Sequence, residues 1–428
     1  MRCRSSEERF DTRNRKEPLM PALDGLRILD MTQYEAGTSC TQALAWLGAD
    51  VVKIEQPGQG DPGRGVREDG LDSPYFVAWN SNKRSVAIDL SSERGRELLL
   101  ELAPHYDVFV ENYGPGVMER LGLTYEALKS VQPSIIYARI KGFGLTGPYA
   151  EFKCFDPIAQ NAAGAFSTTG FADGPPTMPK AAVGDSGTGM QMAFAIAAAY
   201  IQRLRTGEGQ EIEISMQEAM TYYMRTYVSQ TEAWGDSVVP RNGNGFGFSA
   251  SDLYPCKPAP DSDGSNDYVY IILTTSRMWD TLCTAMDRPE LTVDPRFVED
   301  EERVEHQAEL QEEIRSWTLQ HTKWEAQEIL AGAGVPCSAT HDTYDLFHNP
   351  HFEERGFIQH LDHPEWGAIR QLGWAPRLSG STVAMTAAPL LGQHTAQVLC
   401  DDLGIEAEEF AKLDAEGIVS GHRSGLSG

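Results

Sequence analysis

The chain of 428 residues carries 36 basic and 62 acidic side chains, a formal net charge of −26, and 41% of its residues are hydrophobic. This length exceeds that of one ordinary domain, and the apolar share is ample for a buried core. The negative charge argues against nucleic acid or an anionic membrane surface as a partner, so an anionic ligand would need a local basic pocket.

The first nineteen residues are highly charged and lack the apolar core of a secretory signal, so we expect residues 1–19 to form a disordered extension. No apolar run in the chain approaches membrane-spanning length. The seven cysteines are scattered and include no Cys-x-x-Cys pair, which is typical of free thiols in a reducing compartment. We therefore expect a soluble, cytoplasmic protein.

The first part of the chain alternates between strand-like and helix-like segments. Strands are expected at residues 26–31, 49–55, 85–90, 108–112 and 135–140, and helices at 39–47, at 92–103 and around Arg120. This alternation predicts an open, doubly wound α/β sheet that binds ligands at the carboxyl ends of its strands. The turn at 33–38 has one glycine where a dinucleotide fingerprint needs three, which argues against a nicotinamide site.

Further along, the sequence predicts a helix at 190–204, a strand at 211–215 and a helix at about 216–232. Composition then changes, with a glycine loop at 241–247 that we expect to be mobile, and a strand at 268–273 followed by helices up to about residue 334. A strand at 367–372 and a helix near 395–403 could return to the first domain. The expected division is a large domain at 20–225, linkers and a small domain at 226–340, and a return to the large domain at 341–428.

Asp185 stands among glycines in the stretch AVGDSGTG, directly before the apolar helix. It could simply cap that helix, as aspartate does well, or it could be a base, a metal ligand or a nucleophile beside free backbone N–H groups. A carboxylate that attacks an activated acyl group forms an anhydride, and this chemistry suits a thioester because a thiolate leaves readily. No second acid or histidine cluster adjoins Asp185 to make a metal site. The local sequence therefore allows Asp185 to act as a nucleophile but does not exclude its other possible roles.

Ser186 is a weaker candidate nucleophile. The stretch Gly184–Gly187 is similar to the sequence around a serine-protease nucleophile, but the α/β pattern does not provide the all-β frame of those enzymes. Thr188 stands where the hydrolase elbow Gly-x-Ser-x-Gly requires its last glycine.

Two other clusters of polar residues are candidate binding sites. Four histidines form two His-x-x-His pairs, but prolines break the segment, which favours surface histidines in loops over a metal site: His348, His351, His360 and His363. The basic stretch at 82–84 could hold a phosphate or form a solvated turn, and the sequence leaves these two interpretations open.

A set of motifs extends along the chain: Leu47–Glu55, Asn82–Ser85, Val110–Gly116, Thr168–Phe171, Asp173–Pro176, Gly184–Ser186, Thr206–Gln210 and Ala388–Thr395. Taken together, this set resembles the class III CoA-transferase family, the carnitine/bile-acid CoA-transferase superfamily. The likeness runs from about Leu23 to the C-terminus. Within the family it is greatest to the formyl-CoA:oxalate CoA-transferase branch.

The resemblance implies a mechanism and an architecture. The acid that matches Asp185 is the family's nucleophile, and it passes through aspartyl anhydrides and an aspartyl-CoA thioester. The substrates are CoA thioesters and free carboxylic acids, with no metal or redox cofactor. The family fold is a Rossmann-like large domain built from both chain ends plus a smaller α/β domain, in an interlocked homodimer.

The resemblance also implies two sets of binding positions. Those that match the family's contacts to CoA are Glu35, Ala36, Gln56, Ile88, Asp89, Leu90, Ser91, Asn112, Tyr113, Gly114, Arg120, Lys153, Cys154, Phe155 and Asp156. Those assigned to the acyl substrate are Tyr75, Gly243, Gly245 and Gly247.

Several positions depart from the pattern of the formyl-CoA enzyme: Glu35 replaces Gln, Gln56 replaces Arg, Ser91 replaces Lys, Val66 replaces Trp and Phe155 replaces Tyr. A small dianion needs hydrogen-bond donors in a tight pocket, so these changes favour a larger or more apolar carboxylate than oxalate or formate.

Two alternatives to CoA transfer stay open. The 2-methylacyl-CoA racemases of the same superfamily use a histidine where this chain has Phe155, so one of their two bases is missing here. A non-catalytic CoA-binding protein would leave Asp185 as a helix cap.

Overall fold

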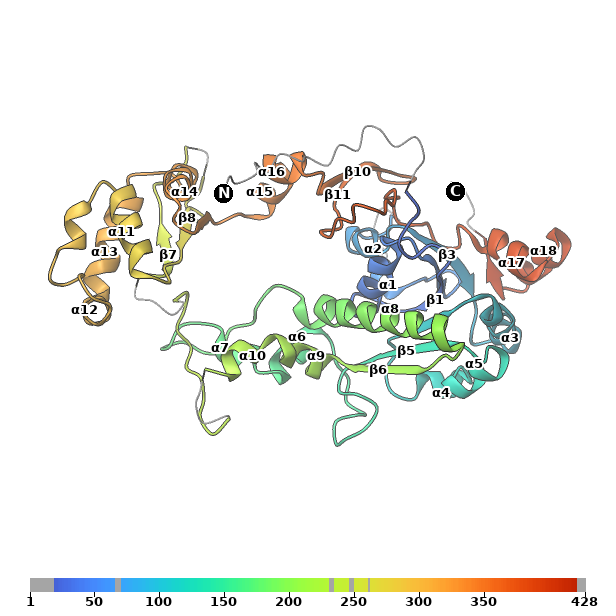
Figure 1. Cartoon of the computed structure of the whole chain (residues 1–428). Coiled ribbons are helices and arrows are strands. Elements are labelled where there is room, and N and C mark those ends of the chain that lie inside the picture. Colours follow the sequence, from blue (N-terminus) through green and yellow to red (C-terminus); the bar gives the residue numbers. More distant parts are fainter. Residues whose placement is uncertain (1–18, 66–70, 231–234, 246–249, 261, 422–428) are drawn as a thin grey trace, which may run out of the picture. The chain divides into compact units, whose positions relative to one another are not determined.

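The computed structural model describes residues 19–65, 71–230, 235–245, 250–260 and 262–421 (Figure 1). The expected extension at 1–19 lies outside these residues except for Leu19, as do Val66 and Gly247. Within the described residues the chain forms two compact units. The first is drawn from Met1–Ala165, Pro179–Thr226 and Arg355–Gly428, and the second from Phe166–Met178 and Tyr227–Glu354.

The first unit contains a seven-stranded sheet in the order β12-β3-β2-β1-β4-β5-β6. Six strands pair in parallel, in the order 3-2-1-4-5-6 of doubly wound nucleotide-binding folds. They are β1 (Arg27–Met31), β2 (Asp50–Glu55), β3 (Lys83–Ile88), β4 (Val108–Glu111), β5 (Ile136–Lys141) and β6 (Glu211–Ser215). The short β12 (Val419–Ser420), from near the C-terminus, pairs antiparallel with β3. The predicted α/β class, with a mainly parallel sheet, is confirmed.

Successive residues of a strand point to opposite faces of the sheet, and both faces are buried here. On one face Ile28 and Val51 pack with α1 (Ala36–Ala45) and α8 (Thr188–Thr206). Gly189 permits the close approach of these two helices, because a Cβ at this position would lie 2.1 Å from the Ser39 Oγ. Figure 1 shows α8 alongside α1.

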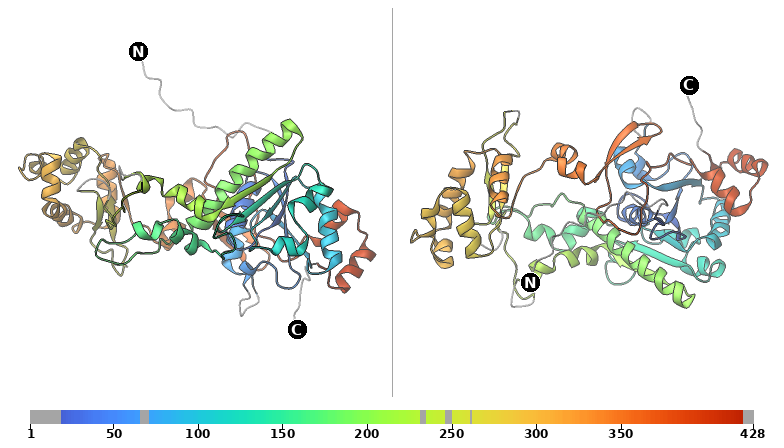
Figure 2. Two further views of the ribbon diagram at one scale, coloured as in Figure 1. Left: turned by 90° about the horizontal axis from the view of Figure 1, so that it is seen from below. Right: turned by 45° about the horizontal axis from the view of Figure 1, so that its top comes forward.

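The other face packs Leu29 and Val52 against helices from both parts of the chain. These are α3 (Glu93–Leu102), α5 (Tyr125–Val131), α17 (Thr395–Leu403) and α18 (Ala407–Ala415). Both views of Figure 2 show the red C-terminal helices beside the blue and cyan helices of the first half. The C-terminal segment thus completes the hydrophobic core of this layer.

Shorter elements complete the first unit. They are the helices α2 (Pro74–Trp79), α4 (Val117–Leu121), α6 (Asp156–Ala162) and α9 (Met216–Tyr223), the 3₁₀ turns η2 (Pro62–Arg64) and η3 (Ala103–His105), the π-helical turn η4 (Val183–Gly187), and the hairpin β10 (Ile358–His363) and β11 (Gly367–Leu372). The short helices α7 (Ala165–Thr168) and α10 (Arg225–Val228) each include residues of both units.

The second unit has a three-stranded antiparallel sheet in the order β7-β8-β9. Its elements are β7 (Asp252–Pro255), β8 (Tyr268–Ile271), β9 (Cys337–Ala339), α11 (Ser276–Ala285), η5 (Pro289–Thr292), α12 (Asp300–Glu305), α13 (Gln307–Thr318), α14 (Lys323–Gly332), α15 (Thr343–His348) and α16 (Pro350–Glu354). Its own core contains Val269, Trp279, Leu310 and Ile314.

Two sequence-based expectations about local structure are wrong. The helix expected at 216–232 breaks at Met224, whose N–H donates to the Thr221 carbonyl in a tight turn while its side chain joins a small apolar cluster with Met220. The four histidines are not all loop residues, because His363 lies in β10, is 2% exposed, and accepts the backbone N–H of Trp366 on its Nδ1. Among the described residues no helix is both long enough and apolar enough to cross a membrane.

Candidate active site

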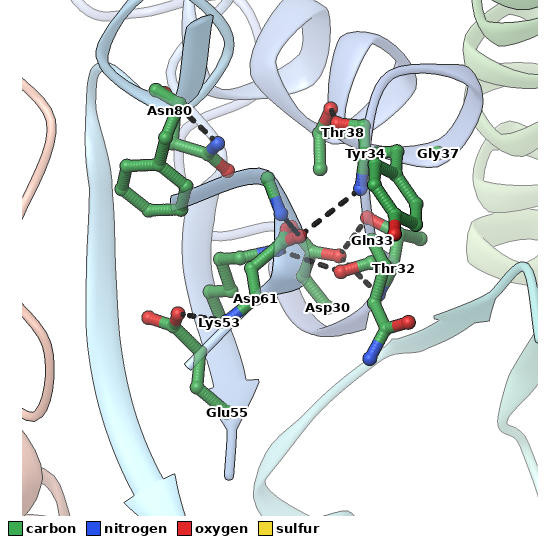
Figure 3. A network of polar contacts seen from close by, with 12 residues as sticks. Asp30, Thr32, Gln33, Tyr34, Gly37, Thr38, Lys53, Glu55, Asp61 and Asn80 are labelled. Carbon is green, nitrogen blue, oxygen red and sulfur yellow. Dashed lines mark hydrogen bonds and ion pairs between the residues drawn. The ribbon is translucent and has the colours of Figure 1, made fainter. Parts of the chain in front are cut away.

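The turn between β1 and α1 is held by buried ion pairs (Figure 3). The Lys53 Nζ lies 2.8 Å from an Asp61 carboxylate oxygen and donates to the Thr32 carbonyl at 2.6 Å. The Lys83 Nζ lies 3.0 Å from the Asp30 carboxylate, and both of these side chains are completely buried. Such charges are stable in a protein interior only when they are paired and hydrogen-bonded. The pairs therefore fix the end of β1 and the residues that follow it.

These contacts settle the role of the basic stretch at 82–84. Lys83 is committed to Asp30, and the Arg84 guanidinium lies 2.6 Å from the Asp50 carboxylate. Asn82 bonds the backbone of residues 384 and 386. Lys83 is thus neither a phosphate ligand nor part of a solvated turn, because its charge is buried against Asp30, whereas Arg84 and Asp50 pair at a partly exposed position.

Tyr34 has an unusual backbone conformation for a non-glycine residue, with φ at +58°. Its N–H donates to the Asp61 carboxylate at 3.1 Å, and the Thr38 hydroxyl donates to its carbonyl. This arrangement sets the Tyr34 ring edge-to-face on Phe155, with 5.9 Å between the ring centroids. The two rings form part of the wall of a cavity.

Asp185 lies in the π-helical turn η4, directly before α8. Neither this turn nor α8 has a side-chain cap, so the interpretation of Asp185 as a helix cap is wrong. The expectation of free backbone donors is also wrong for two residues. The Asp185 N–H donates to the Asp156 carboxylate at 3.1 Å, and the Ser186 N–H donates to the Ala182 carbonyl. The turn thus fixes the backbone of Asp185, while the Asp185 carboxylate itself forms no structural contact among the described residues.

In the part of the chain that the structure describes, the Asp185 carboxylate has no hydrogen-bond or ion-pair partner. It lines a cavity of about 230 Å³ at the carboxyl ends of β1, β4 and β5. The other lining residues are Gln33, Tyr34, Ala36, Asn112, Tyr113, Gly114, Pro115, Ile140, Lys141, Gly142, Ala150, Phe152, Lys153, Cys154, Phe155 and Met216. An unpaired carboxylate in a half-buried pocket is available to react.

Asp185 has two acidic neighbours in the fold, Asp156 and Glu35, which lie far from it in the sequence. Burial and the nearby Asp156 raise the pKa of Asp185 to about 7. Glu35 is 7% exposed, and burial, Asp185 and Asp156 raise its pKa to about 8. The Tyr75 hydroxyl faces Glu35 and partly offsets this rise in its pKa. Among the described residues these acids form no group suited to holding a metal ion.

Seven of the positions expected to contact CoA line this cavity together with Asp185: Ala36, Asn112, Tyr113, Gly114, Lys153, Cys154 and Phe155. Asn112 is fixed by two hydrogen bonds with the Gln33 backbone, each of 2.8 Å. Lys153 is exposed and has no ion-pair partner among the described residues. It can therefore offer its charge to an anionic ligand.

The remaining expected positions lie elsewhere. Gln56 and Asp89 follow β2 and β3 and are joined by a hydrogen bond of 3.1 Å, next to exposed Ser91. Ile88 and Leu90 point into the core, so only their backbone could meet a ligand. Arg120 is exposed on α4, outside the cavity lining.

The positions assigned to the acyl substrate divide between the two units. Tyr75 lies beside Glu35 in the first unit. Gly243 and Gly245 belong to the second unit, where the Gly243 N–H donates to the Gly170 carbonyl.

The cavity also contains Gln33, Tyr34 and Phe152, which the sequence did not indicate as ligand-binding residues. Gln33 and Tyr34 had an available signal, because they follow the carboxyl end of a strand, where this fold binds ligands and where Lys141 was expected. Lys141 is held by Glu111 at 2.7 Å.

Comparison with known proteins identifies the family of the chain. The model of CoA-transferase family III matches residues 23–395. A formyl-CoA:oxalate CoA-transferase of Streptomyces avermitilis is 40% identical over 93% of this chain and 99% of its own length. One from Rhodopseudomonas palustris is 36% identical over 93% and 97%. The crystal structure of a CAIB/BAIF family protein from Brucella suis superimposes with a TM-score of 0.79 at 32% identity, covering 90% of this chain and all of that one. The chain thus belongs to CoA-transferase family III and is a CoA-transferase.

Proposed function

We propose that the chain moves CoA from an acyl-CoA thioester to a free carboxylic acid, with Asp185 as the covalent nucleophile. The observation that carries this proposal is the half-buried Asp185 carboxylate, which opens into the cavity without a structural partner among the described residues. Its raised pKa, about 7, supports the proposal, because a more basic carboxylate is a better nucleophile and remains substantially ionised at neutral pH.

The reaction proceeds by exchange at acyl carbons. A carboxylate oxygen of Asp185 attacks the thioester carbonyl, the C–S bond breaks, and CoA leaves as a thiolate. The thiolate attacks the aspartyl carbonyl of the anhydride, which releases the donor acid and leaves an aspartyl-CoA thioester. The acceptor carboxylate then attacks this thioester and displaces the thiolate again. Finally the thiolate attacks the acceptor's acyl carbon, which forms the new acyl-CoA and restores the Asp185 carboxylate.

The expected binding positions suggest how CoA is held. The exposed cations Lys153 and Arg120 lie on the large unit near the carboxyl edge of the sheet, where they can attract the phosphates of CoA despite the net charge of −26. Asn112 to Gly114 provide a rigid wall toward Asp185. This chemistry uses CoA thioesters as substrates and needs no resident metal or redox group.

The acids exchanged are proposed to differ from oxalate and formate, which appear in the names of the curated relatives. Phe155 brings no hydroxyl to the pocket, and the rings of Tyr34, Phe152 and Phe155 line it. Such walls favour a larger or more apolar carboxylate. A panel of donor thioesters against acceptor acids, read by mass spectrometry, identifies the pair.

Asp185→Ala tests the nucleophile. The variant should lose CoA transfer while it retains CoA binding, and hydroxylamine or borohydride added during turnover should modify Asp185 in the unmodified enzyme. The matched control is Glu126→Gln, which changes an exposed acid on α5 and should leave transfer intact. Turnover by the Ala variant would contradict the assigned role.

Two other activities are distinguished by simple measurements. A racemase would incorporate solvent deuterium at the α-carbon of an acyl-CoA with no acceptor acid present. A non-catalytic CoA-binding protein would bind CoA but give neither deuterium incorporation nor transfer. Phe155 disfavours the racemase because a phenyl ring cannot exchange a proton.

A cytoplasmic homodimer is the proposed form of the protein, in keeping with the family architecture. An apolar face on α8 supports self-association, since Phe194 is 78% exposed, Ile201 50% and Leu204 68%. Light scattering of the purified protein should report twice the mass of 47.2 kDa.

A further inference from the structure

Glu35 differs from the other buried acids at the carboxyl edge of the large sheet. Asp30 is paired with Lys83, Asp61 with Lys53, and Glu55 with Arg64. Glu111 is likewise paired with Lys141. Glu35 is almost as buried as these acids but has no ion pair in the described part of the chain.

The groups that face Glu35 make an ionised carboxylate unfavourable there. Tyr75 approaches from α2, Asp156 from α6 and Asp185 from the turn η4, while Tyr34 precedes Glu35 on its own turn. Two of these are acids and none is a cation. The start of α1, for which Glu35 is the N-cap, and the Tyr75 hydroxyl favour a negative charge, but they offset little against burial and two like charges.

We propose that Glu35 is a positioning residue that works as a neutral carboxylic acid, and that its ionisation sets the alkaline limit of CoA transfer by repelling the acceptor carboxylate. This inference rests on the proposed function of Asp185. A neutral Glu35 leaves Asp185 as the one acid that must be ionised for attack. An ionised Glu35 would add a negative charge beside Asp185, where the anionic acceptor has to react.

We expect the pH dependence caused by Glu35 to appear in the KM for the acceptor acid rather than in kcat. With the unmodified enzyme, the KM for the acceptor acid should rise, by up to about tenfold for each pH unit, once Glu35 loses its proton. In the acylated enzyme this happens no higher than about pH 8, because the Asp185 charge that helps to raise the pKa of Glu35 is then absent. The KM for the acyl-CoA donor should change much less. In Glu35→Gln, which has nearly the same shape and cannot ionise, the acceptor KM should stay within about threefold between pH 7 and pH 9.5. Glu126→Gln should keep the wild-type profile. A rise in Glu35→Gln equal to that of the wild type would overturn the proposal.

Tyr75→Phe provides a second test that does not remove Glu35. The Tyr75 hydroxyl stabilises the ionised form of Glu35, so its loss should move the rise in acceptor KM to higher pH. An unchanged position, or a shift to lower pH, would contradict the role of Glu35.

A stability measurement separates this inference from the proposed function. The pKa of Glu35 is raised above its ordinary value of 4.5, so the folded enzyme loses stability as the pH rises from about 4.5 to about 8. The Glu35→Gln variant has no proton to lose at this position, so it does not show this loss of stability. Its Tm should therefore match the wild type at pH 4.5 and exceed it by a few degrees at pH 9, whether or not transfer is detected. Equal Tm values for the wild type and Glu35→Gln at pH 9 would show that ionisation of Glu35 does not oppose folding. Failure of every donor and acceptor pair to react would instead refute the proposed function.

Discussion

Replacing Asp185 by asparagine should abolish activity and stabilise the fold at the same time. The carboxylate is partly buried beside Asp156 and unpaired among the described residues, so ionising it opposes folding. Asparagine has nearly the same shape and no charge. A reactive group that the fold holds at a cost in stability is expected at an active site.

The size of the effect follows from the pKa, which rises from 3.8 to about 7 on folding. At about 1.36 kcal/mol per pKa unit this corresponds to roughly 4 kcal/mol, and partial exposure to solvent reduces it to roughly 2–3 kcal/mol. Because the folded-state pKa is the higher one, wild-type stability falls as pH rises from about 3.8 to about 7. The gain in Asp185→Asn should be absent below pH 4 and complete above pH 7.

The assay is thermal unfolding of both proteins at pH 4 and pH 8, at one protein concentration, because two units need not unfold as one transition. The Tm of Asp185→Asn should be a few degrees higher at pH 8 and unchanged at pH 4. Transfer should fall by about a thousandfold or more. Glu126→Gln should alter neither quantity. A lower Tm at pH 8, or an equal gain at both pH values, would refute this account of the site.

Three further substitutions test the framework, each by Tm or denaturant midpoint. Lys83→Met leaves the buried Asp30 without its cation and should cost about 3–5 kcal/mol of stability; a loss below about 1 kcal/mol would argue against the buried pair. Gly189→Ala forces a Cβ into α1 and should cost more than about 2 kcal/mol, whereas Gly332→Ala, a helical position with open space, should be neutral or stabilising. Ser92→Ala removes the side-chain cap of α3 and should cost about 1 kcal/mol, with no change in transfer.

Elements with a strong local pattern could be predicted from the sequence. The strand at 211–215, the strand at 367–372 and the helix at 395–403 have the bounds expected from alternation and turn residues. Ser92 begins the helix expected at 92–103, and its hydroxyl accepts the Gly95 N–H, as a serine N-cap does. These features depend on neighbours in the chain, which is the information that a single sequence contains.

Features that depend on long-range pairing could not be predicted in this way. The basic stretch containing Lys83 resembles a solvated turn until its partner Asp30 is placed beside it. His363 resembles a surface residue, but it is 2% exposed in the folded structure, and the N–H groups that it accepts come from the nearby Glu365 and Trp366. In both cases local polarity indicated exposure, but tertiary packing buries the side chain, and for Lys83 it also supplies the charge partner.

The acids around Asp185 illustrate the same limit at the site itself. Asp156 begins α6 and Glu35 ends the turn after β1, so neither adjoins Asp185 in sequence. Each has an ordinary local explanation, as a helix-start acid or as a turn residue. Burial, the larger cause, and the convergence of these acids in the fold raise the pKa of Asp185 and of Glu35. A pH dependence of transfer that is altered by substitutions at all three positions, and by no exposed acid, would show that the reactivity of Asp185 arises from the fold and not from its local motif.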